Sequence, residues 1–192
     1  MSKTVWDVSA SLDGFTSGPN VRPEEPMGDG GESLHDWMAG EGPDSEVDLA
    51  VRRDVTENIG ALVIGRRTFD LGLENWGGTP WPGIPSFVVT HRPRPDLLGD
   101  NGGTFAFGGL DEGARRASEA AGDKDVRVMG ADVARQLLRA GRIDEIWLHV
   151  APLLLGGGTP MFDGELVELI PEGRALAGKA THLRFRVGKG SA

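Results

Sequence analysis

Residues 61–69 read Ala-Leu-Val-Ile-Gly-Arg-Arg-Thr-Phe, an apolar run followed at once by a glycine and two arginines. The apolar residues 61–64 predict a buried strand, and the residues from Gly65 onward predict the start of a short helix. Cations at a helix N-terminus are unfavourable by about 0.3–1 kcal/mol unless something negative neutralises them. A phosphate would remove this conflict, because the free N–H groups and both guanidinium groups would bind it. Alternatively, Arg66 and Arg67 are simply solvated.

Two further strand ends carry residues that suit a phosphate. The predicted strand 86–90 ends in Thr-His-Arg at residues 90–92, which brings a hydroxyl, an imidazole and a guanidinium group together. The predicted strand 126–129 runs into Gly-Ala-Asp-Val at residues 130–133, where small residues open a helix and let the backbone approach a pyrophosphate. Open α/β sheets bind ligands outside the carboxyl ends of their strands, so we expect the three ends to converge on one anion. The spacing matches neither the GxGxxG fingerprint nor the P-loop.

Strand-like and helix-like runs alternate along the chain and predict an α/β fold. Runs rich in Val, Ile, Phe and Trp predict strands at residues 4–9, 61–64, 86–90, 104–107, 126–129 and 145–150. Helical spacing predicts helices at residues 46–58, 114–121 and 132–140, the last of them stopped by Gly141. Strand-helix-strand units imply a parallel sheet. The runs 165–170 and 182–187 have no helix between them and predict an antiparallel edge.

Two segments lack periodicity and are expected to be surface loops, residues 17–44 and residues 72–85. The second carries Trp76 and Trp81. Loops of this length in a compact domain are usually functional or disordered. The indoles therefore either line the rim of a pocket or anchor the loops on the core.

Composition narrows the classes of protein and partner. The 192 residues, 39% of them hydrophobic, predict a single domain. The formal net charge of −9 disfavours nucleic acid or an anionic membrane as the partner. The expected partner is a small-molecule substrate. The absence of cysteine excludes disulfides, thiolate nucleophiles and Cys-based metal sites, and it fits a cytoplasmic protein. There is no export signal and no long apolar span, so we expect neither export nor membrane insertion. No pair of His residues has metal-ligand spacing and no Ser sits in a nucleophile elbow, so we expect neither a metal nor Ser-type acyl transfer.

Five motifs, taken in order, resemble those of one superfamily. They are Ser11-Leu12-Asp13-Gly14-Phe15, Val63-Ile64-Gly65-Arg66-Arg67-Thr68-Phe69, Val88-Val89-Thr90-His91-Arg92, Met129-Gly130-Ala131-Asp132, and the run from Asp144-Glu145-Ile146 to Gly156-Gly157-Gly158. Nearly the whole chain is similar to the dihydrofolate reductase-like superfamily, and more closely to the branch that contains the C-terminal reductase domain of riboflavin biosynthesis and its stand-alone relatives. This resemblance implies a three-layer α/β/α fold with a central, mostly parallel sheet and antiparallel C-terminal edge strands. It also implies a cytoplasmic, NADPH-dependent oxidoreductase of a small heterocyclic substrate, and a homodimer formed through residues 146–155 and the late strands.

The resemblance also assigns residues to roles. It implies that the phosphates of NADPH bind to Gly65, Arg66, Arg67, Thr68, Thr90, His91, Arg92, Gly130, Ala131, Asp132 and Val133. It further implies that Asp13 and Phe15 lie near the nicotinamide and the substrate, and Asp13 is the expected catalytic carboxylate, as proton donor or substrate anchor. Apart from the resemblance, His35 and Trp37 in the loop 17–44 are expected to line the substrate pocket, the alternative being that His35 is only solvated. Two positions depart from the pattern: Met129 stands where riboflavin-pathway reductases usually have an acidic residue, and Asp36 or Asp48 would have to replace the helical carboxylate of folate reductases.

Each of these interpretations has an alternative. An Asp before Gly is a common turn residue, so the alternative role of Asp13 is to shape a turn. His149 lies on the opposite strand face from Ile146 and Leu148, and hydrogen-bonded packing is favoured over a pocket role. Residues 156–158 are either a backbone approach to the cofactor or a bend. For the whole chain, the alternatives are a non-catalytic binding module that kept the reductase fold, or a scaffolding subunit.

Overall fold

The computed structural model describes residues 2–40, 45–92, 94–164 and 166–188. The chain forms two compact units. Unit 1 comprises Met1–Trp6 and Asn58–Ile143, and unit 2 comprises Asp7–Glu57 and Asp144–Ala192. The first strand, β1 (Thr4–Ser11), contributes residues to both units.

Unit 1 is built on a parallel sheet. Its strands lie in the order β1, β7 (Asp125–Met129), β3 (Ile59–Gly65), β4 (Ser86–Val89) and β6 (Thr104–Gly108), with the short β5 (Leu97–Leu98) antiparallel at the edge. The central strand β3 is buried along most of its length, which is why its sequence is continuously apolar rather than alternating. Val63 pairs with Val128 of β7 on one side and with Phe87 of β4 on the other.

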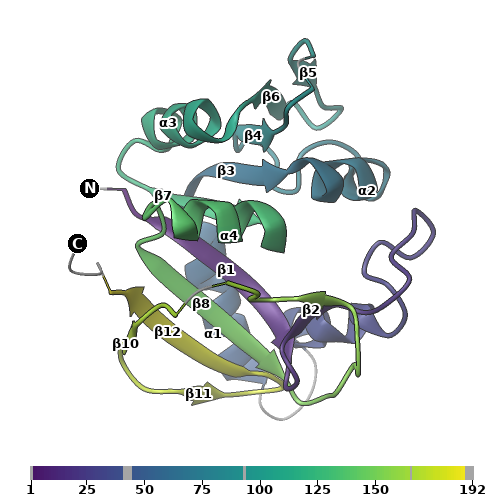
Figure 1. The fold of residues 1–192 in the computed structure, drawn as a ribbon, viewed down its shortest axis with the longest axis vertical. Helices are drawn as coiled ribbons and strands as arrows, with labels where there is room; N and C mark the ends of the chain where they lie inside the picture. The colour runs from purple at the N-terminus through teal and green to yellow at the C-terminus, as the bar shows by residue number, and fades with distance from the viewer. Residues whose placement is uncertain (1, 41–44, 93, 165, 189–192) are drawn as a thin grey trace. The chain divides into compact units, whose positions relative to one another are not determined.

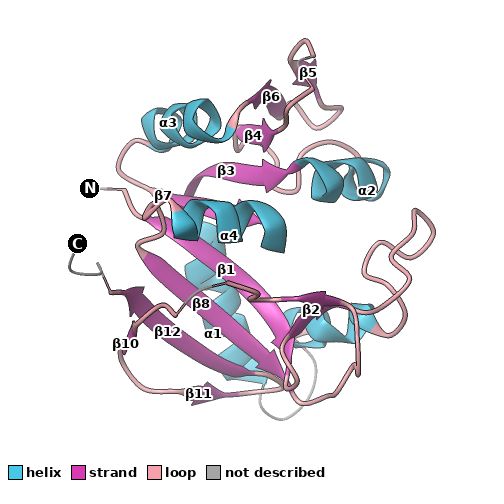
Figure 2. Cartoon of the chain, in the orientation of Figure 1, coloured by secondary structure: helices cyan, strands magenta, loops and turns pink. Residues whose placement is uncertain are grey.

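Three helices cover the two faces of this sheet, as Figure 2 shows in cyan. They are α2 (Arg66–Trp76), α3 (Leu110–Ala121) and α4 (Ala131–Arg139). On one face, Phe69 of α2 packs into a core of strand residues. That core comprises Ile59, Leu62, Ile64, Val88, Phe105 and Phe107. On the other face, Gly113 of α3 lies against Val89 and Val133 of α4 lies against Gly65. Unit 1 is therefore a three-layer α/β/α arrangement.

Unit 2 carries the antiparallel strands. Its order is β10 (Leu169–Pro171), β12 (Thr181–Val187), β8 (Glu145–Ala151) and β1, with β11 (Leu176–Ala177) paired to β12 (Figure 1). A separate two-stranded sheet joins β2 (Phe15–Ser17) to β9 (Thr159–Pro160). The helices of this unit are the 3₁₀ helix η1 (Gly31–Ala39) and α1 (Ser45–Glu57).

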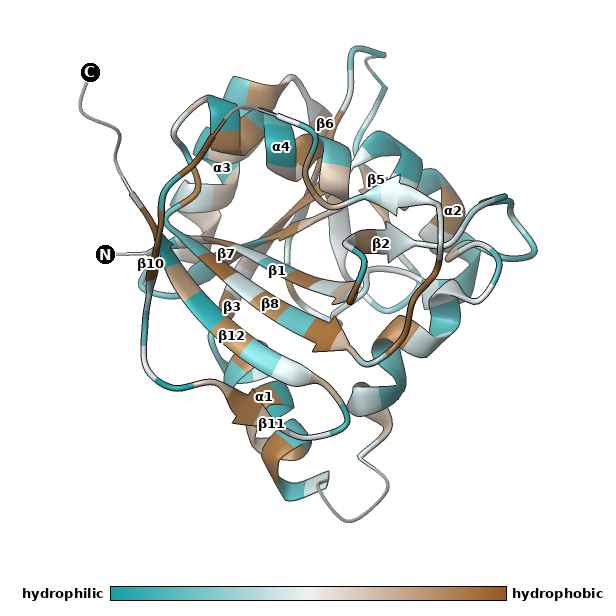
Figure 3. Ribbon diagram, turned by 60° about the horizontal axis from the view of Figure 1, so that its bottom comes forward, coloured by the Kyte–Doolittle hydropathy of each residue, from teal (hydrophilic) through white to brown (hydrophobic). Residues whose placement is uncertain are grey.

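Side chains alternate along β8 and β12, and Figure 3 shows the alternation as bands of brown and teal. The register places His149 opposite His182 and Trp147 opposite Arg184, so these four side chains share one face of the sheet. Trp37 of η1 packs on that face, with its ring centroid 4.4 Å from that of His149. Polar side chains thus occupy the buried layer of unit 2, and hydrogen bonds between them hold the sheet and the helices together.

The predicted fold class is confirmed, with parallel strands between helices followed by antiparallel strands near the C-terminus. Each predicted strand and helix is present, with shifted ends in several cases: α3 begins at Leu110 and β10 covers only Leu169–Pro171 rather than residues 165–170. Of that range, residue 165 lies outside the described residues. The expectation of a single domain stays a prediction.

Two segments expected to be loops contain helices. Helix α2 runs on to Trp76 and includes Gly72. Residue 72 has to be a glycine because any side chain there would overlap the Trp76 indole. This glycine provides space for packing and does not end the helix. The segment 17–44 contains η1, in which Gly31, Leu34 and Trp37 are buried at intervals of three. That period belongs to a 3₁₀ helix, and a search for the α-helical period misses it. Residues 41–44 lie outside the described residues.

Candidate functional site

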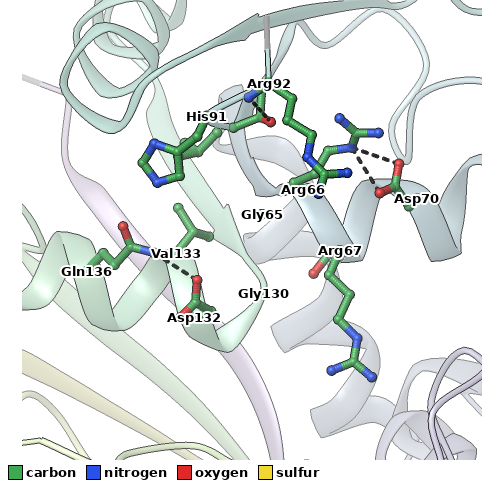
Figure 4. A pocket seen from close by; sticks show the side chains of 13 residues that line it. Gly65, Arg66, Arg67, Asp70, His91, Arg92, Gly130, Asp132, Val133 and Gln136 are labelled. Atoms are coloured by element: carbon green, nitrogen blue, oxygen red, sulfur yellow. Dashed lines mark hydrogen bonds and ion pairs between the residues drawn. The ribbon is translucent and has the colours of Figure 1, made fainter.

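A pocket of about 450 Å³ opens in unit 1, past the carboxyl ends of β3, β4 and β7. Its size falls in the range of small-molecule sites. Figure 4 shows it from close by. It is lined by Gly65, Arg66, Arg67, Thr68, Asp70, Val89, Thr90, His91, Arg92, Gly130, Asp132, Val133 and Gln136. The three strand ends that the sequence singles out therefore meet in one hollow.

Arg66 begins α2 and binds a carboxylate one turn further along the helix. Its Nε lies 2.8 Å from Oδ1 and 2.9 Å from Oδ2 of Asp70. Arg66 is thus not simply solvated, because Asp70 supplies part of the negative charge expected at this helix start. The neighbouring Arg67 is exposed and extends away from Arg66 and Asp70 in Figure 4.

The second strand end is shaped by a buried threonine. Thr90 is 8% exposed, and its Oγ1 accepts a hydrogen bond from the Arg92 backbone N at 3.0 Å. The Thr90 backbone N donates to the Gly108 carbonyl at 2.8 Å, which ties the corner to the neighbouring strand β6. The corner therefore holds the exposed His91 and Arg92 at the pocket while its own backbone stays anchored.

The third strand end comes close to the first. Gly130 has φ 102°, a conformation that favours glycine, and a Cβ on it would lie 2.5 Å from Thr68 Oγ1. A Cβ on Gly65 would in turn lie 3.4 Å from Val133 Cγ1. The turns that open α2 and α4 can approach each other this closely because residues 65 and 130 are both glycines.

The pocket presents a positive electrostatic environment to a ligand. The residue before each helix is a glycine, so no side chain of that residue caps the first N–H groups of α2 or α4. The positive groups of the lining are two helix N-termini and three arginines, and its negative groups are two carboxylates, Asp70 and Asp132. Asp132 accepts a hydrogen bond from Gln136 Nε2 at 2.8 Å. Unpaired N–H groups, small turns and planar guanidinium groups are the donor set that a pyrophosphate and a further phosphate require. The residues present thus fit a phosphorylated dinucleotide.

The pocket contains the expected phosphate-binding residues, with the exception of Ala131, which begins α4 without lining it. Sequence reasoning missed Asp70, Val89 and Gln136. Asp70 lies four residues after Arg66 on α2, and Gln136 lies four residues after Asp132 on α4, so the i,i+4 rule is the signal that could have found both.

Asp13 lies in unit 2, where it joins two loops. Its carboxylate accepts hydrogen bonds from Ser11 Oγ at 2.5 Å, Leu155 N at 3.1 Å and Gly156 N at 2.7 Å. The Ser11 hydroxyl and these N–H groups hold the pKa of Asp13 below its ordinary value, against a smaller opposing effect of burial. A carboxyl group with a lowered pKa is a poor proton donor at neutral pH, so these contacts favour the alternative in which Asp13 shapes its loop over the donor role. The backbone N–H groups of Leu155 and Gly156 thus connect their loop to the loop that carries Asp13.

The residues expected in the substrate pocket, Phe15, His35 and Trp37, also belong to unit 2. Phe15 begins β2, and its backbone N donates to Ser11 Oγ at 3.0 Å. Trp37 is buried, and its Nε1 donates to Ser9 Oγ at 3.0 Å. His35 is half-buried, and burial lowers its pKa, with a further lowering by the charge of His149.

His149 and the helical carboxylate Asp48 meet in unit 2 through His182. His149 Nδ1 lies 2.7 Å from His182 Nδ1, and His182 Nε2 lies 2.8 Å from Asp48 Oδ1. Asp48 is fully buried in the first turn of α1, whereas Asp36 is exposed on η1. The favoured interpretation of His149 as a hydrogen-bonded packing residue is consistent with these contacts.

The described residues contain neither a cluster of metal-ligating side chains nor a membrane-spanning helix. No group of three or more His, Cys, Asp or Glu side chains among them is arranged to hold a metal ion. Within the same part of the chain, no helix has the length and apolarity needed to cross a membrane.

Comparison with known proteins connects this fold to one group. Residues 112–184 match the family RibD C-terminal domain. The uncharacterized protein YwjB of Bacillus subtilis (strain 168) is 26% identical over 164 residues, which cover 83% of this chain and 82% of that protein.

Solved structures share the fold over 98% of this chain. A putative riboflavin biosynthesis protein from Shewanella sp. PV-4 is matched over its full length with a TM-score of 0.69 and 22% identity. A pyrimidine reductase-like protein from Corynebacterium diphtheriae is matched over 93% of its length with a TM-score of 0.62 and 16% identity. RibD of Acinetobacter baumannii is matched over 58% of its length with a TM-score of 0.59 and 17% identity. The predicted fold is confirmed: the chain has the dihydrofolate reductase-like fold, and residues 112–184 are similar to the RibD C-terminal domain.

Proposed function

We propose that this protein is a cytoplasmic, NADPH-dependent reductase of a small heterocyclic substrate that resembles either 5-amino-6-(5-phosphoribosylamino)uracil or a pterin. The observation that carries the proposal is the convergence of three strand ends on one cationic pocket. The match of residues 112–184 to the RibD C-terminal domain supports a reductase. When bound, NADPH would supply a hydride for the reduction.

The chain's own residues have three tasks in this proposal. The N–H groups at the starts of α2 and α4 bind the pyrophosphate, and Gly130 lets the backbone approach it. Arg66, Arg67 and Arg92 provide the charge that distinguishes the 2′-phosphate of NADPH from the free hydroxyl of NADH. Asp13 keeps the loop after β1 in place as an anchor on the substrate side.

The proposal extends to the substrate pocket and to the subunit contact. Phe15, His35 and Trp37 line the substrate side. A homodimer forms through residues 146–155 and the late strands, which carry the exposed Leu154 close to the exposed Leu12. These two loops are joined by a hydrogen bond from Leu12 N to the Leu153 carbonyl at 2.9 Å. A monomeric mass by light scattering would reject the dimer.

Titration with NADPH and NADH tests the central proposal. NADPH at about 100 times its Kd should raise the free energy of unfolding by about 2.7 kcal/mol, and NADH should bind more weakly. Arg92→Gln should reduce the preference for NADPH. Arg115→Gln is the matched control, because Arg115 pairs with Glu119 on α3 and does not line the pocket.

The outcomes separate the candidate functions. No change in nicotinamide fluorescence or thermal stability with excess NADPH rejects the reductase. Binding of NADPH without oxidation in the presence of pterins, pyrimidines or quinones would instead support the non-catalytic binding module.

A further inference from the structure

A second cavity, of about 480 Å³, lies in unit 2. Its lining comes from α1, from β8 and β12, and from the connection between β10 and β11. It shares no lining residue with the pocket in unit 1, and none of the expected substrate residues lines it. The lining consists of Ala50, Val51, Asp54, His149, Glu172, Gly173, Arg174, Leu176, His182, Leu183 and Arg184.

Backbone contacts fix the outer wall of the second cavity. Strands β10 and β11 pair with opposite ends of β12, and the residues between them leave its edge (Figure 1). At one end, Glu172 N donates to the Arg184 carbonyl at 2.8 Å, and at the other end Leu176 pairs with His182. Gly173 has φ 75°, which turns the chain between these two points. The wall is therefore held at both ends of its departure from β12.

Side-chain contacts fix the opposite wall, which is helix α1. Asp48 Oδ1 in its first turn lies 2.8 Å from His182 Nε2 on β12. Asp54, further along the helix, accepts a hydrogen bond from the Arg184 guanidinium group. That group also stacks on Trp147, with its Cζ 3.7 Å from the ring centroid. These contacts join α1 to the sheet on the cavity side, so the second cavity is present without a ligand.

The buried members of the lining form an apolar floor. Val51, His149 and His182 are at most 4% exposed. The facing Nδ1 atoms of the two imidazole rings lie 2.7 Å apart. The Nε2 atom of His149 lies 3.2 Å from Asp7 Oδ1, and that of His182 lies beside Asp48. Because all four ring nitrogens have a neighbour within hydrogen-bonding distance, the floor offers a ligand mainly carbon atoms.

The charged members of the lining are paired, with one exception. Asp54 binds Arg184, and Glu172 Oε1 lies 3.2 Å from Arg186 Nε. Arg174 is exposed, and the described part of the chain provides no hydrogen-bond or ion-pair partner for its side chain. A guanidinium group binds a carboxylate through two parallel hydrogen bonds. One positive charge balances a carboxylate but leaves a phosphate dianion only half compensated.

We propose that the second cavity is a ligand site for a small aromatic carboxylate. The carboxylate binds to Arg174 at the mouth, and the ring system packs on Val51 and on Leu176, which is 46% exposed. An aromatic body suits this cavity because it buries a large apolar area without ordering rotatable bonds. This site goes beyond the reductase function proposed above and does not depend on it.

Amide NMR of the nitrogen-15-labelled full-length protein tests the location of the site, with 2-naphthoate as the probe. The backbone signals of Gly173, Leu176 and Arg184 should shift along one saturable curve, with a Kd of about 1 mM or lower for a ligand of this size. The signals of Gly65 and Gly130 report separately on the pocket in unit 1. Shifts confined to those two signals, or no saturable shift at Gly173 and Leu176, would overturn the proposal.

The neutral isostere 2-naphthamide tests the role of the charge. The wild type should bind 2-naphthoate about fivefold or more tightly than the amide, because only the carboxylate makes charge-assisted hydrogen bonds with the guanidinium group. Arg174→Gln should remove this preference and leave the Kd of 2-naphthamide unchanged. Arg53→Gln is the matched control, since Arg53 is exposed on α1 outside the lining, and it should keep the preference. An undiminished preference in Arg174→Gln rejects Arg174 as the carboxylate-binding group.

A side chain that fills the second cavity tests the apolar part of the site. Ala50 is exposed on α1 and lines the cavity, so Ala50→Phe should weaken the binding of both probes by about tenfold or more. Ala120→Phe is the matched control, because Ala120 is exposed on α3 and lines neither pocket. It should bind both probes as the wild type does. Wild-type affinity in Ala50→Phe would show that the probes bind elsewhere and would reject the site.

Discussion

Thr68 and Gly130 belong to different turns, and the Oγ1 atom of Thr68 lies where a side chain at residue 130 would begin. A Cβ on Gly130 would be 2.5 Å from that oxygen. The first turn of α2 and the turn before α4 thus share one small space at the pocket. Substitutions in this space are expected to affect ligand binding and folding together.

Gly130→Ala should lower the free energy of unfolding by about 1–3 kcal/mol, since alanine at φ 102° is strained and its methyl group displaces Thr68. It should also weaken NADPH binding. Gly141→Ala is the control: this residue follows α4, has φ 65° and has open space around a Cβ, so only the backbone cost of about 1–2 kcal/mol applies. Urea unfolding and NADPH titration measure both effects. Equal NADPH affinity in the two variants would show that the turn is not part of the site.

Asp70→Asn should tighten NADPH binding. Asp70 occupies the guanidinium group of Arg66 and adds a negative charge to the pocket, so a phosphate has to compete with it. An exposed ion pair is worth about 0.2–1 kcal/mol, which predicts a Kd lower by roughly 1.5- to 5-fold. Glu119→Gln breaks the pair at the same spacing on α3, outside the pocket, and should leave the Kd unchanged. Weaker binding by Asp70→Asn would mean that Asp70 orients Arg66 for the ligand.

Asp13→Asn should make the protein less stable at neutral pH but not in acid. The folded-state pKa of Asp13 is lower than that of the unfolded chain, chiefly because of the Ser11 hydroxyl. Its contribution is therefore present above the ordinary carboxyl pKa of 3.8 and is lost as pH falls through the lower folded-state value. Urea midpoints of the two proteins should converge as the solution is acidified. If the urea midpoints of the two proteins differed by the same amount at every pH, the charge of Asp13 would not contribute to its hydrogen bonds between the loops.

The protein should lose stability as pH falls below about 6.5, and His35→Gln should reduce that loss. Burial lowers the folded-state pKa of both His35 and His182 below the ordinary value of 6.5. The unfolded chain therefore binds protons first, so stability is fully present above this value and falls as pH decreases toward the folded-state values. Unfolding curves at several pH values between about 8 and 5 measure the slope. An unchanged slope in His35→Gln would assign the loss to His182 and other groups.

The sequence specifies several features through local chemistry. The continuous apolar run at residues 61–64 is a buried strand because hydrophobic burial on both faces suits a parallel sheet. The sequence predicts that the residues after β3, β4 and β7 bind phosphate together, because the carboxyl ends of parallel strands lie at one edge of a sheet. Their convergence in one pocket follows from that topology.

Tertiary structure alone decides the pairings between distant residues. Residues from Gly72 onward are predicted to be a loop, whereas in the structure the Trp76 indole packs at Gly72 inside α2. The sequence alone leaves Arg66 solvated or bound to a phosphate, whereas α2 brings Asp70 beside it. Asp7, His149, His182 and Asp48 lie far apart along the chain and have no shared motif. Three strands and a helix bring them within hydrogen-bonding distance, and buried polar groups have to be paired there. Local propensity therefore determined the elements and their ends at the pocket, whereas packing determined which polar groups meet.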